Sequence, residues 1–348
     1  GATADGHWLL ARNFDSEVGV TFDRDKVVRV HRPDDGIPFL SVAFAGLAGA
    51  VSGVNEAGIA VAINASASDE PPRLGTPMTL IVREILEHAT SLEDAERILR
   101  ERNGFLSENV LVVDADHDRA ALFEITPTRL ARIDVQGSLA VSNHFRSPMF
   151  DDDATTAYRK AHGTTVQRLE RMEELLVEHD GTLDLTTGVD LLKDRKGVGG
   201  VDLVRGHRQA VDADIATHGV VIDATTRTVR ISRYPNLVGG WVELKLEDVL
   251  AGDLEATLVR PAEPDASVAL GMRRARQVLL KQARWGQDPL GNTEEALRLL
   301  PGHPEALEAR GEALWDVDRE GAKVLLQQAL DARPEYPHQV EAIEELLK

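Results

Sequence analysis

The sequence predicts an α+β fold in which layered antiparallel sheets are covered by helices and followed by a helical C-terminal segment. Between residues 7 and 231, short apolar runs alternate with glycines and turn residues, which is typical of closely spaced strands. Helical patterns interrupt these runs in only two places, which favours antiparallel pairing over a parallel sheet with one helix per crossover. The composition changes near Leu250, and the remainder is nearly all helical in pattern.

The expected elements follow from apolar spacing along the chain. Strands are expected at residues 7–14, 38–54, 58–66, 109–115, 120–125, 129–133, 139–143, 218–224 and 228–233. The segment from Gly53 to Gly58 has the turn chemistry of a hairpin. Apolar residues at helical spacing predict helices over residues 78–102 and 165–178, the first with a break at Thr90–Ser91 that caps a second helix.

The C-terminal part is expected to form a separate helical domain. Residues 258–270 contain two prolines and predict a linker between an N-terminal domain, 1–255, and a helical domain, 265–348. Residues 304–337 resemble one tetratricopeptide unit, and weaker helical patterns precede them at 268–285 and 293–300. Because such repeats need about three copies to be stable alone, the segment should dock on the main domain. It acts either as a packed cap or as a binding site for a peptide or protein partner.

Composition excludes several classes of function. The 58 acidic residues exceed the 39 basic ones by 19, so the surface should repel nucleic acid and anionic lipid. No apolar run is long enough to cross a membrane. The absence of cysteine excludes disulfides and thiol catalysis by these 348 residues. The 11 histidines show no metal-ligand spacing and the glycines show no dinucleotide fingerprint, so neither metal nor cofactor is expected.

Two polar segments at predicted strand ends are candidates for catalysis. Arg12, Asn13, Phe14 and Asp15 end the first strand, and alternation directs Arg12 and Phe14 to one face and the other two to the opposite face. A surface ion pair explains this pattern equally well. Asn143 follows the expected strand at 139–143, where its amide could stabilise an oxyanion, a contribution of roughly 3 kcal/mol. An ordinary turn is the alternative.

A third candidate lies at the start of the helix predicted at 165–178. A threonine, Thr164 or Thr165, can cap this helix, and Arg168 falls in its first turn. A cation is disfavoured at the positive end of the helix dipole. The position of Arg168 therefore requires a neighbouring carboxylate or an anionic ligand.

Six blocks in this order resemble the C45-type N-terminal-nucleophile (Ntn) hydrolases, the family of acyl-coenzyme A:isopenicillin N acyltransferase, and more distantly the choloylglycine hydrolases. The blocks are residues 2–15, 32–64, 83–99, 140–145, 164–176 and 206–232. The resemblance implies a four-layer αββα sandwich. It also implies a precursor that cleaves itself before a cysteine, whose thiol is the nucleophile and whose α-amine is the base.

The resemblance assigns roles to the three segments. Arg12, Asn13 and Asp15 match the family's Arg-Asn-x-Asp motif, in which the aspartate holds the α-amine. Asn143 matches the oxyanion-hole asparagine. Arg168 matches an arginine that sets the charge and orientation of the nucleophile, with Asp15 as its expected partner. The three segments should therefore converge on one cleft.

The family's cysteine lies a dozen or more residues before the motif aspartate, so we expect it upstream of Gly1. Without it the chain should be inactive. Thr3 is able to act as an N-terminal nucleophile, but two residues would have to be removed and it lies too close to Asp15 for the family spacing.

Two hypotheses about function follow. The first is an enzyme that hydrolyses or transfers acyl groups at amide or thioester bonds of a small-molecule substrate. The second is an inert Ntn fold that acts as a binding scaffold through its C-terminal helices.

Overall fold

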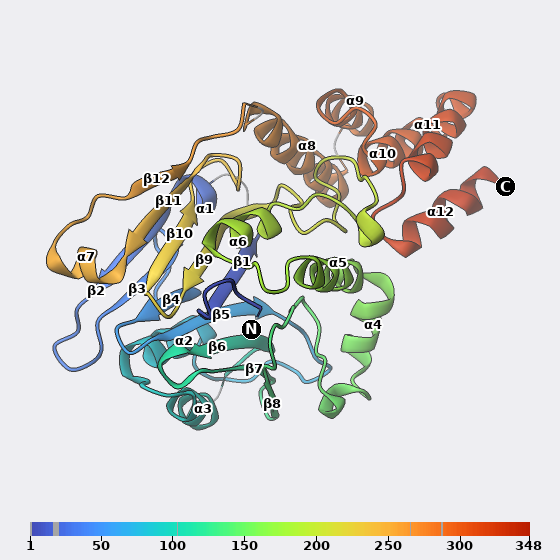
Figure 1. Ribbon diagram of the computed structural model, residues 1–348. Coiled ribbons are helices and arrows are strands. Elements are labelled where there is room, and N and C mark those ends of the chain that lie inside the picture. Colours follow the sequence, from blue (N-terminus) through green and yellow to red (C-terminus); the bar gives the residue numbers. More distant parts are fainter. Residues whose placement is uncertain (1, 17–20, 103, 265, 287) are drawn as a thin grey trace.

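Two antiparallel sheets lie face to face at the centre of the computed structural model, which describes residues 2–16, 21–102, 104–264, 266–286 and 288–348 (Figure 1). The five-stranded sheet has the order β1 (Leu9–Asp15), β9 (Ala216–Asp223), β10 (Thr228–Ser232), β11 (Trp241–Lys245), β12 (Thr257–Arg260). The seven-stranded sheet runs in chain order through β2 (Lys26–His31), β3 (Phe39–Phe44), β4 (Ser52–Asn55), β5 (Ile59–Ala65), β6 (Glu108–Asp114), β7 (Arg119–Ile125) and β8 (Leu130–Asp134).

Helices cover the outer face of each sheet. The apolar faces of α2 (Met78–His88) and α3 (Leu92–Glu101) pack on the seven-stranded sheet. On the other side, α6 (Leu185–Leu192) packs against β9 and β11, and α5 (Thr165–Glu178) lies beside it (Figure 1). A separate apolar cluster fills the space between the sheets. This arrangement confirms the predicted α+β class and the αββα layering.

Several local predictions are confirmed. The helical stretch breaks at Ser91, whose hydroxyl accepts the N–H of Asp94 at 3.2 Å and caps α3. The hairpin between β4 and β5 turns at Gly58, where φ is +75° and a side chain would be strained. The second predicted helix coincides with α5.

The expected strand at residues 139–143 is wrong. This segment joins no sheet among the described residues. The side chain of Asn109 bonds its backbone instead: Nδ2 donates to the carbonyls of Ser142 at 3.0 Å and of the adjoining His144 at 3.2 Å. Other elements were not predicted: strands β2, β11 and β12, the short helices α1 (Thr21–Arg24) and α7 (Leu246–Ala251), and helices α4 (Ala154–His162) and α6.

The C-terminal segment consists of helices α8 (Ala266–Trp285), α9 (Pro289–Leu299), α10 (Pro304–Leu314), α11 (Arg319–Asp331) and α12 (Pro337–Leu347). The pair α10 and α11 is the predicted tetratricopeptide-like unit, and Gly311 permits its close packing, since a Cβ there would lie 2.7 Å from Leu326 Cγ. The predicted linker begins inside β12 and ends inside α8, so only its middle part connects the sheets to the helices. The domain boundaries at 255 and 265 stay a prediction.

None of the helices in the described ranges is long and apolar enough to cross a membrane.

Candidate active site

Arg12 lies between the two sheets rather than on the surface. Its side chain is 6% exposed, its Nη2 donates to the Ile63 carbonyl at 2.6 Å, and its Nη1 donates to Ser52 Oγ at 3.2 Å. The guanidinium lies 4.6 Å from the centre of the Phe14 ring, as strand alternation predicts. Burial lowers the pKa of Arg12 to about 10, against the opposing effects of Asp15 and Glu108. The alternative of a surface ion pair is therefore wrong for this segment.

Asn13 faces the opposite side of β1 and ties the strand to the outer layer. Its Nδ2 donates to the carbonyls of Leu192 at 2.8 Å and Val211 at 3.3 Å. These two acceptors lie at the end of α6 and in the segment before β9. Asn13 therefore has a structural role, since it holds β1 against its neighbours.

Asp15 ends β1 at an irregularity in its pairing with β9. The side chain keeps an exposed surface, yet surrounding protein desolvates it enough to raise its pKa. Arg168, then Arg208, Arg12 and Arg276, act in the opposite direction and lower this pKa. Asp15 is therefore an exposed carboxylate at the end of β1 whose desolvation is opposed by the charges of arginines.

Asn143 and Arg168 contact each other directly. Arg168 Nη2 donates to Asn143 Oδ1 at 2.7 Å, and Asn143 Nδ2 donates to the Ala65 carbonyl at 2.9 Å. Because a guanidinium can only donate, the contact fixes which end of the amide is the carbonyl. The amide of Asn143 therefore keeps its N–H groups on the side away from Arg168.

Thr165 holds the Asn143 segment in place, a role that the sequence analysis missed. Its Oγ1 accepts the Asn143 N–H at 2.8 Å, donates to Ser142 Oγ at 2.8 Å, and lies 2.8 Å from His144 Nδ1. The predicted threonine side-chain cap is wrong, because Thr164 occupies the N-cap position without a capping bond and Thr165 is used in this network. The pair Thr164–Thr165 at the start of the helix is the sequence signal that is compatible with this network as well as with a cap.

A direct contact joins two of the three predicted segments, and the third, at Asp15, is connected to Arg168 through charge alone. Arg168 is bonded to Asn143, and Arg168 and Asp15 each act on the pKa of the other. Burial lowers the pKa of Arg168, and Asp15 is the largest charge that opposes this. Asp15 as the carboxylate expected near the helix N-terminus stays a prediction. The catalytic roles of Asp15, Asn143, Arg168 and Arg12 stay predictions.

Glu108 is a further group of the site region that the sequence analysis did not single out. It begins β6 directly opposite Ala65, whose carbonyl binds Asn143. Its Oε2 is buried and has no hydrogen-bond partner among the described residues. Burial raises the pKa of Glu108 to about 7, although Arg12 lowers it. A carboxyl group with this pKa takes up and releases a proton near neutral pH.

We expect Glu108→Gln to stabilise the protein at pH 8 but not at pH 4. The pKa of Glu108 is raised from 4.5 to about 7 in the fold, so stability falls as the pH rises across this window. The shift corresponds to at most about 3 kcal/mol above pH 7. Urea unfolding of both proteins at the two pH values measures the difference. Glu247→Gln, at an exposed position, is the control. An equal effect of Glu108→Gln at both pH values would contradict the expectation.

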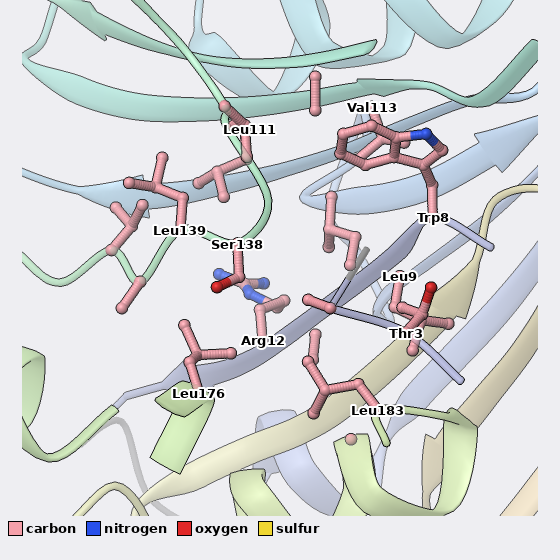
Figure 2. A pocket seen from close by; sticks show the side chains of 18 of the residues that line it. Thr3, Trp8, Leu9, Arg12, Leu111, Val113, Ser138, Leu139, Leu176 and Leu183 are labelled. Atoms are coloured by element: carbon pink, nitrogen blue, oxygen red, sulfur yellow. The ribbon is translucent and has the colours of Figure 1, made fainter. Parts of the chain in front are cut away.

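An apolar cavity of about 430 Å³ lies beside β1, at the end of the strand away from Asp15 (Figure 2). Residues of β1, the inner face of β5 and β6, and helices α5 and α6 line it. Leu139, Leu176 and Leu183 face the strand across this space (Figure 2). Arg12 lines it, whereas Asp15 and Asn143 do not, so the cavity adjoins the site through Arg12 (Figure 2).

Thr3 lies at this far end of β1 as well. It pairs with Leu183, and its Oγ1 donates to the His7 carbonyl at 2.8 Å. The strand between Leu9 and Asp15 spans about 20 Å, so Thr3 is remote from Asp15 and is not placed to act as the nucleophile. Gly1, which carries no nucleophilic side chain, lies outside the described residues.

Carboxylates and a histidine gather at the start of β1. The ligand atoms of Asp5, His7 and Asp223 lie within 4.8 Å of one another, and His7 Nδ1 is 2.9 Å from Asp223 Oδ2. This group joins the first loop to β9 and is separated from Asp15 by the length of β1. Asp153 of the acidic run at 151–153 caps α4 through the Thr156 N–H at 2.8 Å, which is a structural role.

Comparisons with known proteins support the resemblance. A family model described as acyl-coenzyme A:6-aminopenicillanic acid acyl-transferase matches residues 2–209 of the 348. No curated protein matches the chain in sequence.

The solved structures that match this chain include the following three. A variant of conjugated bile acid hydrolase from Clostridium perfringens is 12% identical over 71% of this chain and 91% of that chain, with a TM-score of 0.45. Penicillin V acylase from Agrobacterium tumefaciens is 14% identical over 74% and 91%, with a TM-score of 0.41. An N-acylethanolamine-hydrolyzing acid amidase ortholog from Caenorhabditis elegans is 12% identical over 64% and 90%, with a TM-score of 0.43.

Proposed function

Because the chain belongs to the acyl-coenzyme A:6-aminopenicillanic acid acyl-transferase family, we propose that it hydrolyses or transfers acyl groups through an acyl-enzyme on an N-terminal cysteine. The contact between Arg168 and Asn143, together with the effect of Arg168 on Asp15, is the observation that carries this proposal. Arg168 bonds the Asn143 amide and lowers the pKa of the exposed Asp15 carboxylate, and a cation, an amide and a carboxylate are the groups that this chemistry uses.

The proposed reaction has two halves. The cysteine thiol gives its proton to its own α-amine and attacks the carbonyl carbon of an amide or thioester, which creates an oxyanion. An N–H of Asn143 stabilises this oxyanion, and Asp15 holds the ammonium group beside it. The leaving amine or thiol takes the proton, and an acyl-enzyme remains. Water or an amine then takes the acyl group and restores the thiol.

The free edge of β1 offers a place for the segment that carries the cysteine. The Trp8 carbonyl accepts the Ala224 N–H at 2.9 Å, so strand alternation turns the backbone groups of Leu9, Ala11 and Asn13 away from β9. No strand in the described ranges pairs with this second edge. An extended segment upstream of Gly1, running antiparallel to β1, would bring its first residue to Asp15.

The proposal is tested on a chain extended upstream of Gly1 by its own coding sequence. We expect a cysteine about a strand length before Gly1, self-cleavage in front of it, and a mass increase on the mature chain after addition of an activated ester. Replacement of that cysteine by alanine is the control, and it should abolish both events. An upstream sequence without a cysteine, or a matured chain that forms no adduct, would refute the proposal.

The alternative, a scaffold that binds a peptide through its C-terminal helices, stays a prediction. These helices are bound to the main domain next to the site, through contacts that are described below.

A further inference from the structure

Helix α8 holds the segment before β9 through two buried arginines. Arg276 Nη1 donates to the Ala213 carbonyl at 3.0 Å, and its Nη2 also contacts the Gly206 carbonyl. One turn earlier, Arg273 Nη2 donates to the Ala216 carbonyl at 2.7 Å. The segment 206–216 is thereby fixed from the C-terminal side of the molecule.

Glu335, between α11 and α12, binds the middle of this same segment. Its side chain is 1% exposed, and its Oε1 accepts the backbone N–H of Arg208 at 2.7 Å and Arg276 Nη2 at 3.3 Å. The Glu335 carbonyl accepts Gln209 Nε2 at 2.9 Å, and His207 Nε2 lies 2.9 Å from the Arg333 carbonyl. Three successive residues of the segment therefore contact residues 333–335.

The segment held by these contacts also reaches Asp15 through the backbone, because Asp15 pairs with Ala216 and the Ser16 N–H donates to the Ile215 carbonyl at 3.2 Å. Arg208 is, after Arg168, the largest charge that lowers the pKa of Asp15, and Arg276 has the same effect. Tyr336, next to Glu335, raises the pKa of both Arg168 and Arg208. The C-terminal helices thus contribute to the electrostatic environment of Asp15 from a distant part of the sequence.

A charged interface is a costly way to attach a helical cap. Burying Glu335 and Arg276 requires desolvation that apolar side chains of similar volume would avoid. Burial raises the pKa of Glu335 to about 7, which reflects this cost. The retained charges specify one geometry of the segment, and that geometry sets the position of Arg208.

We propose that the C-terminal helices complete the candidate site, with Glu335 fixing the backbone of Arg208 so that the Arg208 guanidinium acts as a positioning charge on Asp15. The catalytic meaning of this arrangement rests on the proposed function, but the electrostatic connection does not. Arg208 is a positioning residue, since it acts through Asp15.

The test is a titration of the Asp15 carboxyl by NMR in the full 348-residue chain, with aspartate labelled with ¹³C and the signal assigned from Asp15→Asn. In Arg208→Gln the pKa of Asp15 should rise by about 0.5 to 1 unit, because an opposite charge is lost. Glu335→Ala should raise it in the same direction. Glu335→Gln keeps an oxygen for the Arg208 N–H and should stay close to the parent.

The matched control is Arg274→Gln, on α8 but 66% exposed and paired with Glu295. Arg208→Gln leaves the Glu335 contact intact because that contact uses the backbone, so this variant serves even if Glu335→Ala does not fold. An unchanged pKa of Asp15 in Arg208→Gln, or in a folded Glu335→Ala, overturns the proposal. A shift in Arg274→Gln as large as in Arg208→Gln also overturns it. Because no turnover is measured, an inactive extended chain would leave this result unaffected.

Discussion

Asn143→Ala, in the extended chain that carries the N-terminal cysteine, should form its acyl-enzyme about 10²- to 10³-fold more slowly than the parent. Arg168 fixes the amide through Oδ1 and one N–H binds the Ala65 carbonyl, which leaves the second N–H for the developing oxyanion. The burst of product from an activated ester, followed by stopped-flow, measures this rate.

Asn143→Asp separates loss of the donor from disturbance of the fold. The carboxylate keeps an oxygen for Arg168 but has no N–H, so the loss of rate should be at least as large as in alanine. Acylation of either variant at the parental rate would show that Asn143 is not the oxyanion donor.

Arg168→Met should slow acyl-enzyme formation by about 10²-fold, because misplacement of a reacting group by about 1 Å costs this much. The change removes the anchor of Asn143 and the strongest cationic neighbour of Asp15. The pKa of Asp15 should therefore rise by about 1 unit. Stopped-flow acylation and titration of Asp15 give the two readouts.

Arg168→Lys distinguishes these two effects. Lysine keeps the charge, so the pKa of Asp15 should return toward the parental value. It lacks the planar fork that reaches Asn143, so the rate of acylation should stay low. Arg159→Met, at an exposed position of α4, is the control. A parental acylation rate in Arg168→Met would remove this residue from the proposed mechanism.

The layers of the fold could be predicted because apolar spacing records which face of each element is buried. Ser91 and Gly58 marked a helix start and a hairpin through local chemistry, and the structure confirms both. The strand predicted at 139–143 failed because the partner of its backbone is the side chain of Asn109, which apolar pattern does not reveal.

The candidate site could be predicted from the sequence only in part. Spacing alone left Asp15, Asn143 and Arg168 as separate signals with structural alternatives, and the family resemblance was needed to join them. Thr165 and Glu335 act through contacts with residues that are 21 or more positions away, and no local pattern marks such contacts. Residues that contact a site from a distant part of the sequence can therefore be identified only from the three-dimensional structure.

The buried guanidinium of Arg12 has a mechanical consequence. Arg12 belongs to one sheet and binds Ser52 and Ile63 of the other. Sliding the two sheets past each other would break these hydrogen bonds and leave a positive charge unpaired in an apolar layer. The spacing between β1 and β5 is consequently fixed before any substrate arrives. Under the proposed function, adaptation to acyl groups of different size would come from α5, α6 and the loops, while the central layers behave as a rigid frame.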